Sequence, residues 1–390
     1  MKPLRLLPQA DRRVRLGHLW IFANEVDVDA TPLRDFAAGE LAVVHDARGG
    51  RVGLAYVNPA ALICARILST SADATIDTRW FAARMRRALA LRERLYPSPH
   101  YRAVYGESDG LAGLVIDRYG DTLSVQLNTA GMVAMRRMVL AAIEEVFSPS
   151  GILIGSAASV RALEGLAGDE ERLGEVPDEV EVLEGGLLIR APLLGGQKTG
   201  YYYDQRENRL RVGRYAAGSS LLDVYSYVGA WALAGLACGA SAATCVDASQ
   251  TALDYSQANA ERLGHRIECL RGDALEVLER LGGERRTFGV VIVDPPALAK
   301  RRRDLPVATA HYRRINAAAL KLVAEGGTLV SASCSQHLPP EGLARLLLDA
   351  ARLSGRRFTI VERHAHPPDH PIHPAMPQTE YLKTFFCAVW

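Results

Sequence analysis

The chain has 390 residues, of which 48% are hydrophobic and 23% are charged, and its net charge is +2. This length predicts two or three domains. No run of 18 uncharged apolar residues occurs and the first residues lack the apolar centre of a signal peptide, so we expect a cytoplasmic protein without a membrane partner. The six cysteines form no C-x-x-C pair, which argues against a disulfide framework or a structural zinc site.

Arginine is unevenly distributed. Clusters lie at 12–15, 84–94, 206–214, 300–303 and 313–314. Local patches matter more than the total charge for phosphate binding, so these clusters are candidates for contacts with a nucleic acid. For any single cluster, a solvated helix face is the favoured alternative.

Residues 1–72 predict a small β-rich module of the barrel type. Alternating apolar segments at 40–46 and 51–58 flank Asp46-Ala47-Arg48-Gly49-Gly50, which is typical of a hairpin, and a third strand is expected at 61–69.

Residues 73–184 predict a central α+β domain. Apolar residues at helical spacing indicate helices over 78–96 and 132–147, and strands turned at Tyr119-Gly120-Asp121 lie between them. A further strand is expected at 152–159. The acidic, glycine-containing stretch 168–186 is either a linker or an edge hairpin.

Residues 185–390 alternate strands with amphipathic helices, the pattern of a doubly wound, mostly parallel sheet. Strands are expected at 219–227, 243–249, 267–273, 288–296, 326–333, 357–364 and 381–390. No helix separates the last two, so the final strand should insert antiparallel. This part predicts an α/β domain.

Polar side chains lie at or just beyond the carboxyl end of each of the first five strands of this sheet. They are Asp223, Asp247, Asp273, Asp294 and Cys334. Ligands bind beyond the carboxyl ends of the strands in such sheets, so these residues should converge on one edge. Asp247 is placed to bind a ribose diol and Asp273 an adenine amino group. Each aspartate could instead cap the following helix.

The loop after the first of these strands distinguishes two cofactor classes. It reads Asp-Val-Tyr-Ser-Tyr-Val-Gly-Ala over 223–230, with one glycine and two bulky aromatic residues. A dinucleotide needs the G-x-G-x-x-G approach of its pyrophosphate. S-adenosylmethionine has no phosphate, so this glycine-poor loop favours S-adenosylmethionine.

Asp294-Pro295-Pro296 and Cys334 together suggest a mechanism. Enzymes that methylate exocyclic amines carry an aromatic residue after such a motif, but Ala297 stands here. A thiolate that adds to pyrimidine carbon-6 makes carbon-5 nucleophilic, and Asp294 could assist at ring N3. The alternative is that Cys334 is a small buried residue ending a strand.

Several long motifs resemble one family. GHLWIFANEV (17–26), YGESDGLAGLVIDRYGD (105–121), LLGGQKTGYYYDQRENR (193–209), SASCSQH (331–337) and DHPIHPAMPQTEYLKTFFC (369–387) look like the RlmI-like ribosomal RNA cytosine-5 methyltransferases. The resemblance covers essentially the whole chain. It implies an N-terminal PUA-like β-barrel, a central α+β domain and a C-terminal Rossmann-like class I methyltransferase domain with seven strands, the last antiparallel.

The resemblance also implies roles for individual residues. Cys334 would be the nucleophile, with Asp294 and Pro295 at the target cytosine. Residues around S-adenosylmethionine would be Lys198, Thr199, Tyr203, Asp204, Arg206, Asp223, Tyr225, Ser226, Tyr227, Gly229, Asp247, Ala248, Asp273, Ala274 and Asp294. Residues that bind RNA would be Arg12, Arg13, Trp20, Lys300, Arg301 and Arg302. The product would be S-adenosylhomocysteine, the partner 23S ribosomal RNA, and a homodimer the expected assembly.

Three positions depart from the family pattern. Val228 replaces a threonine and Ala230 a glycine, and Gln336 stands where many members carry histidine. No metal is expected at the four histidines of HAHPPDHPIHP (364–374), because their spacing matches no usual metal site. Two alternatives stay open, namely methylation of another ribosomal RNA atom such as guanine N7, and a non-catalytic RNA-binding assembly factor.

Overall fold

The computed structural model of the chain describes residues 1–155, 161–166, 170–195, 200–299 and 301–390. It divides into two compact units. The first unit comprises residues 1–180, 192–203 and 368–379. The second comprises residues 181–191, 204–367 and 380–390. Among the described residues, no helix combines the length and the apolar character needed to cross a bilayer.

The N-terminal part of the first unit is a five-stranded sheet in the order β1-β3-β4-β5-β2. A bridge between Leu6 and Val26 joins the chain beyond β1 to the segment after β2. Asp46 explains the predicted hairpin, because its Oδ1 accepts the backbone N–H groups of Arg48 and Gly50 at 2.9 and 2.8 Å. The elements are β1 (Lys2–Arg5), α1 (Asp11–Arg15), β2 (Trp20–Phe22), β3 (Glu40–His45), β4 (Arg51–Val57) and β5 (Ile63–Ser69).

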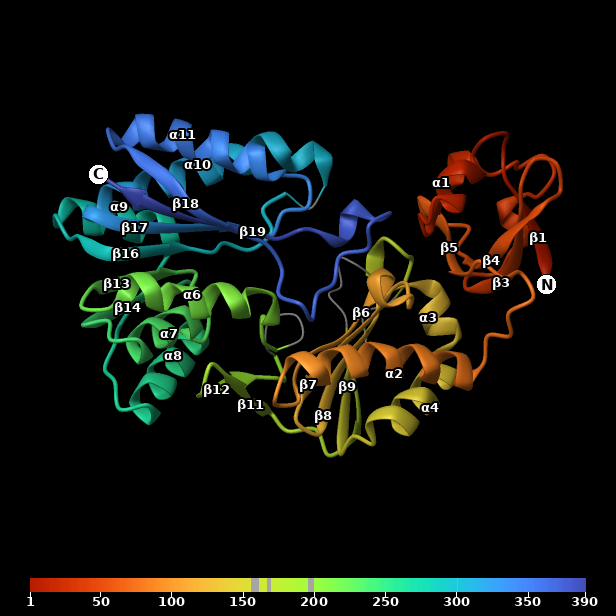
Figure 1. Ribbon diagram of the computed structural model, residues 1–390, viewed down its shortest axis with the longest axis horizontal. Coiled ribbons are helices and arrows are strands. Elements are labelled where there is room, and N and C mark those ends of the chain that lie inside the picture. Colours follow the sequence, from red (N-terminus) through yellow and green to blue (C-terminus); the bar gives the residue numbers. More distant parts are fainter. Residues whose placement is uncertain (156–160, 167–169, 196–199, 300) are drawn as a thin grey trace. The chain divides into compact units, whose positions relative to one another are not determined.

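The remainder of the first unit is built on a second five-stranded sheet, in the order β10-β9-β8-β7-β6. Helices α2 and α4 pack together on it and share one apolar core with it (Figure 1). The elements are α2 (Thr78–Leu95), β6 (His100–Tyr105), β7 (Leu114–Tyr119), β8 (Thr122–Leu127), α3 (Ala130–Ala134), α4 (Arg136–Phe147), β9 (Gly151–Ile154) and β10 (Glu171–Gly174).

One detail of this part differs from the sequence-based expectation. The single helix expected over 132–147 is two helices, because Met135 leaves the helical conformation at φ −93° and ψ 11°. The Thr129 side chain caps the first of them by accepting from Met132 N–H. The acidic stretch 168–186, for which a linker or an edge hairpin was predicted, contains the edge strand β10 and the strand β11 (Glu179–Glu184). Strand β11 pairs with β12 (Leu187–Pro192) in a separate two-stranded sheet.

The second unit contains a seven-stranded sheet in the order β15-β14-β13-β16-β17-β19-β18. Its first five strands are parallel, and β19 lies antiparallel between β17 and β18, as predicted. The strands are β13 (Ser220–Val224), β14 (Ala242–Asp247), β15 (Glu268–Arg271), β16 (Phe288–Val293), β17 (Val323–Ser333), β18 (Phe358–His364) and β19 (Lys383–Val389).

Helices cover both faces of this sheet (Figure 1). One face packs against α9, α10 and α11 and the other against α6, α7 and α8. The strand order reverses between β13 and β16, so a crevice is expected beyond their carboxyl ends. The helices are α6 (Arg206–Ala216), α7 (Ala230–Ala237), α8 (Gln250–Arg262), α9 (Ala274–Gly283), α10 (Leu305–Leu322) and α11 (Pro340–Ser354).

Candidate active site

Asp223 lies near the carboxyl end of β13, a central strand of the second unit's sheet, and is fully buried. Its Oδ2 accepts the backbone N–H of Ala232 at 3.1 Å, at the start of α7. Its Oδ1 has no hydrogen-bond partner among the described residues. Burial, reinforced by the charges of Asp294 and Asp247, raises the pKa of Asp223 to about 8. A buried carboxyl oxygen without a partner suits a ligand that brings a positive charge or a donor.

The loop that follows has an unusual backbone. Tyr225, Tyr227 and Gly229 all have positive φ, at 66°, 49° and 78°. Such a conformation is strained for a tyrosine and must be held by its surroundings. The carbonyl of Val246 accepts the N–H groups of Tyr225 and Ser226 at 2.9 and 3.1 Å. The strain is therefore fixed by the neighbouring strand β14.

Asp247, at the end of β14, positions the same loop. Its Oδ2 accepts Tyr227 N–H at 3.0 Å, and its Oδ1 accepts Ser249 N–H at 2.9 Å. Each carboxylate oxygen keeps a second lone pair for a ligand. Ala248, the next residue, uses its carbonyl to accept from Arg271 at 3.4 Å.

Asp273 caps a helix, which was the alternative to adenine binding that its sequence position allowed. Its Oδ1 accepts the N–H groups of Leu275 and Glu276 at 2.9 and 3.3 Å at the start of α9. The side chain is exposed, whereas Ala274 is buried as the first residue of the helix.

Asp294 follows β16 and is held by two side chains that the sequence did not single out. Oδ1 accepts from Gln205 Nε2 at 2.9 Å, and Oδ2 accepts from Trp231 Nε1 at 3.0 Å. Burial raises the pKa of Asp294 to about 6, although both hydrogen bonds favour the charged form. Gln205 lies inside the motif of residues 193–209, so the family resemblance of that motif could have indicated its role.

Cys334 lies in the turn after β17 and is partly exposed. Its Sγ donates to the carbonyl of Pro295 at 3.7 Å, so the thiol lies beside the Asp294-Pro295-Pro296 segment. The buried Tyr312 hydroxyl bonds both flanking residues, Ser333 at 2.9 Å and Ser335 at 3.1 Å. The backbone that carries the thiol is thereby fixed on both sides.

Lys383 is a further residue that the sequence did not indicate. Its Nζ donates to the carbonyl of Ser335 at 2.6 Å and to that of Tyr381 at 2.7 Å. Burial lowers the pKa of Lys383 to about 8, while the negative charges of Cys334 and Glu380 act in the opposite direction. The site thus contains a thiol, two carboxyl groups with raised pKa values and a buried ammonium group.

Comparison with known proteins shows the family to which the chain belongs. An S-adenosylmethionine-dependent methyltransferase family matches residues 165–383, and a PUA-like domain matches residues 4–70. The ribosomal RNA large subunit methyltransferase I of Klebsiella pneumoniae (strain 342) is 33% identical, over 95% of this chain and 94% of that protein. The protein of the same name from Shewanella amazonensis is 34% identical over 99% of both chains. The chain belongs to this methyltransferase family.

Two solved structures share the fold along their full length. One is the crystal structure of a protein assigned as a methyltransferase and complexed with S-adenosylhomocysteine, with a TM-score of 0.86 and 19% identity. The other, assigned as an S-adenosylmethionine-dependent methyltransferase from Streptococcus mutans, has a TM-score of 0.83 and 18% identity. These structures confirm the predicted fold class, and the family model and the named relatives confirm the predicted family and cofactor.

The residues at the sheet edge fit the cofactor of this family. The unpartnered Oδ1 of buried Asp223 suits the positively charged amino-acid part of S-adenosylmethionine. The lone pairs left on Asp247 suit a ribose diol. Gly229 stands at the start of α7 and adopts the left-handed φ of 78° that this loop requires. When bound, S-adenosylmethionine supplies a methyl group on a positively charged sulfur.

Three other residues predicted for the cofactor take part in internal contacts. In the first unit, Tyr203 donates from its hydroxyl to the Arg118 carbonyl at 2.8 Å and stacks on Tyr119. In the second, Asp204 Oδ2 accepts from the Tyr381 hydroxyl at 2.7 Å. The buried Arg206 side chain has Nε 3.7 Å from Glu184 Oε2. Lys198 and Thr199 lie outside the described residues.

Some of the residues predicted to bind RNA are exposed, and others form hydrogen bonds within the protein. Arg12, Arg301 and Arg302 are exposed. Arg13 instead donates to both carboxylate oxygens of Glu25 at 2.8 Å. Trp20 Nε1 donates to Glu107 Oε1 at 2.8 Å. Lys300 lies outside the described residues.

The histidines of residues 364–374 have protein partners. His366 Nε2 accepts Leu382 N–H at 3.0 Å, and His370 Nδ1 lies 2.8 Å from Asp369 Oδ1. Within the described part of the chain, no group of three potential ligands is placed to hold a metal ion.

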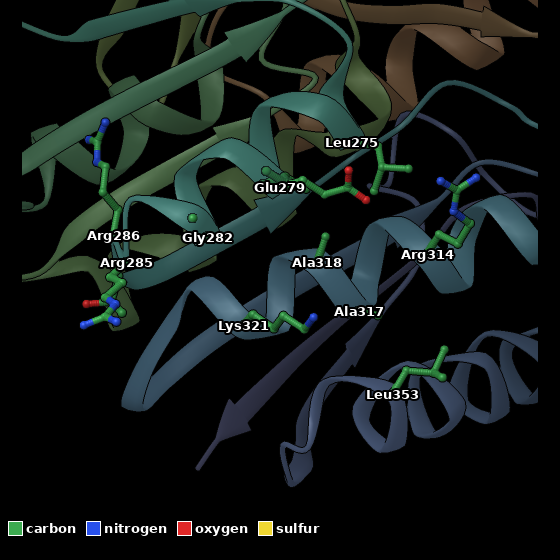
Figure 2. Close-up of a pocket in the computed structure, with 13 residues that line it drawn as sticks. Leu275, Glu279, Gly282, Arg285, Arg286, Arg314, Ala317, Ala318, Lys321 and Leu353 are labelled. Atoms are coloured by element: carbon green, nitrogen blue, oxygen red, sulfur yellow. The ribbon is translucent and has the colours of Figure 1, made fainter.

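A separate groove of about 640 Å³ lies between α9 and α10, toward the amino end of β16 (Figure 2). Leu275 and Ala318 contribute apolar surface, and Arg285, Arg314 and Lys321 bring positive charge. None of the predicted site residues lines this groove, which is therefore distinct from the sheet edge that carries Cys334.

Proposed function

We propose that the protein transfers a methyl group from S-adenosylmethionine to carbon-5 of a cytosine in 23S ribosomal RNA, with Cys334 as the nucleophile. The coarser assignment is supported by relatives named ribosomal RNA large subunit methyltransferase I over nearly the whole chain. The observation that carries the choice of atom is the contact of the Cys334 thiol with the Pro295 carbonyl at 3.7 Å, next to Asp294.

The chemistry follows from the weak nucleophilicity of cytosine carbon-5. The Cys334 thiolate forms a carbon–sulfur bond at carbon-6, and the electron pair of the 5,6 double bond moves to carbon-5, which takes the methyl group. A base then removes the carbon-5 proton, the double bond reforms and the carbon–sulfur bond breaks, which returns the thiolate. No net change occurs at Cys334.

Asp294 has the properties required of the group at ring N3. Its pKa of about 6 lets the carboxyl group carry a proton part of the time near neutral pH, and a protonated carboxyl donates to an unprotonated ring nitrogen. Gln205 and Trp231 hold both oxygens, which limits rotation of the group. Pro295 lacks an N–H donor and leaves its carbonyl free to accept from the base or from the thiol.

The other predicted residues complete the proposal. Asp223, Tyr225, Ser226, Tyr227, Gly229, Asp247 and Asp273 would surround the cofactor. The domain of residues 1–72, together with the exposed Arg12, Arg301 and Arg302, would bind structured RNA through its backbone. The central domain would extend over residues 73–184 and the methyltransferase domain over residues 185–390.

Replacement of the thiol tests the proposal. Ribosomal RNA from cells that lack this protein is incubated with the enzyme and S-adenosylmethionine, and 5-methylcytosine is mapped. C334A should lose at least about 100-fold of the rate, whereas C269A, which removes another partly exposed thiol, should retain it. RNA containing 5-fluorocytosine should form a covalent adduct with the wild-type enzyme and none with C334A.

Three outcomes would contradict the proposal. Full activity of C334A would exclude the thiolate route. Methylation of another atom, such as guanine N7, would change the product. Failure to bind S-adenosylmethionine in calorimetry would favour a non-catalytic assembly factor.

A further inference from the structure

We infer that Lys383 is the cation that maintains Cys334 as a thiolate. The inference rests on the proposed role of Cys334 and adds a residue that acts on it. Strands β17 and β19 are antiparallel neighbours, with Ser333 opposite Lys383. The Lys383 ammonium donates to the Ser335 carbonyl at 2.6 Å. Lys383 therefore lies beside the segment 333–335, at whose centre Cys334 stands.

The ammonium group is buried without a carboxylate partner. Lys383 is 5% exposed, and the hydrogen bonds of its Nζ to described residues reach no carboxylate. Its two hydrogen bonds go to the neutral carbonyls of Ser335 and Tyr381, which leaves one of its three donors. Buried charges are normally paired, because desolvation of an isolated ammonium is costly. A buried, unpaired lysine therefore indicates an anion that is present only in the working state.

Two negative groups act on Lys383. Glu380 is exposed, so water and salt screen its charge. Cys334 is the other, and it acts across the partly buried turn. The two effects are reciprocal, because an ammonium that is stabilised by a thiolate stabilises that thiolate equally. Thiolates next to lysine form at lower pH than free thiols do.

Two other titratable groups near the turn, Tyr312 and Asp294, do not supply this positive charge. Tyr312 bonds both Ser333 and Ser335, but burial raises its pKa to about 12 and it stays neutral. Asp294 brings a negative charge, which disfavours a thiolate. His337 is a titratable group on the same turn, and the experiment must distinguish it from Lys383.

The reaction of Cys334 with iodoacetamide measures its thiolate directly. The rate is followed against pH, with mass spectrometry of the peptide that contains Cys334, in the absence of RNA. We expect a midpoint below the value near 8.5 of a free thiol. K383M should raise that midpoint by about one unit and slow alkylation at pH 7 by about tenfold. K383R, which keeps the charge, should retain most of the reactivity.

Control variants separate charge from packing. K383Q keeps a donor for the two carbonyls but removes the charge, so it should behave as K383M does. K321M removes an exposed lysine of α10 and should leave the midpoint unchanged. Unchanged circular dichroism and S-adenosylmethionine affinity establish that each variant is folded. An unchanged midpoint in folded K383M and K383Q would overturn the inference, and so would a shift produced by H337Q instead.

Failure of this inference can be told from failure of the proposed function. Alkylation needs neither RNA nor methyl transfer, whereas the role of Cys334 is decided by the activity of C334A. If C334A is inactive and the K383M midpoint is normal, only the inference falls. If Cys334 is the nucleophile and Lys383 stabilises its thiolate, K383M should regain methylation activity as the pH rises. At high pH the thiol loses its proton without help from the lysine charge. A purely structural defect would not be rescued in this way.

Discussion

The hydroxyl of Ser335 accepts the backbone N–H of Ala299 at 3.1 Å, and this bond ties the loop after β16 to the turn after β17. Both partners are buried. One loop carries Asp294 and Pro295 and the other carries Cys334. The relative position of the carboxyl group and the thiol therefore depends on a contact that neither group makes itself.

Removal of this bond should impair catalysis more than cofactor binding. S335A leaves the buried Ala299 N–H without its acceptor, which costs about 1–3 kcal/mol. The two loops can then shift, and we expect about a tenfold lower rate of methyl transfer with unchanged S-adenosylmethionine affinity. Single-turnover methylation and calorimetry measure the two quantities separately.

Ser331 provides the matched control for this prediction. It lies on β17, the strand that leads into this turn, is fully buried, and its Oγ has no partner among the described residues. S331A should therefore change neither quantity. Equal rates for S335A and the wild type would show that the loops hold their positions without the hydroxyl.

The positions of the main site residues could be predicted because they follow strand ends. Parallel strands bring their carboxyl ends to one edge, so Asp223, Asp247, Asp294 and Cys334 could be placed together from hydrophobic patterns alone. The antiparallel insertion of β19 likewise follows from the absence of a helix between the last two strands.

The residues that support the site could not be predicted in this way. Trp231 and Tyr312 lie on helices, and Lys383 begins the final strand. Their contacts depend on side-chain directions across the sheet edge, which periodicity does not specify. For Asp273 the position could be predicted but its role could not, because helix capping and cofactor binding both favour aspartate there.

The raised pKa of Asp223 predicts a stability cost that increases with pH. In the unfolded chain this carboxyl group ionises near pH 4, but in the folded protein it keeps its proton up to about pH 8. The free energy of unfolding should therefore fall between these values. D223N removes the ionisation, so the variant should gain at least about 2 kcal/mol relative to wild type between pH 4.5 and pH 8.

Urea denaturation at several pH values measures this difference. The same variant should bind S-adenosylmethionine more weakly, because the ligand loses a negative partner. D273N is the control for the stability measurement, since Asp273 is exposed and asparagine caps a helix equally well. Parallel stability curves for D223N and wild type would contradict the assignment of the pH dependence to Asp223.

Gly229 should be the least replaceable residue of the cofactor loop. Its φ of 78° lies in the left-handed region, and an added Cβ would lie 3.0 Å from Ser256 Cβ. Ser256 cannot move away freely, because its hydroxyl donates to the Tyr227 carbonyl at 2.7 Å. G229A should therefore destabilise the protein by about 2 kcal/mol. Since displacement of Ser256 also disturbs Tyr227, we expect about tenfold weaker S-adenosylmethionine binding.

Gly282 is the matched position for comparison. It lies in α9, where an added Cβ would meet only Leu322 at 3.9 Å, and its φ is not in the left-handed region. G282A should stabilise the protein by up to about 1 kcal/mol, because alanine favours a helix over glycine. Thermal unfolding and calorimetry of both variants test the pair. If G229A matched G282A in stability and in cofactor affinity, the left-handed conformation at Gly229 would not be a requirement of the site.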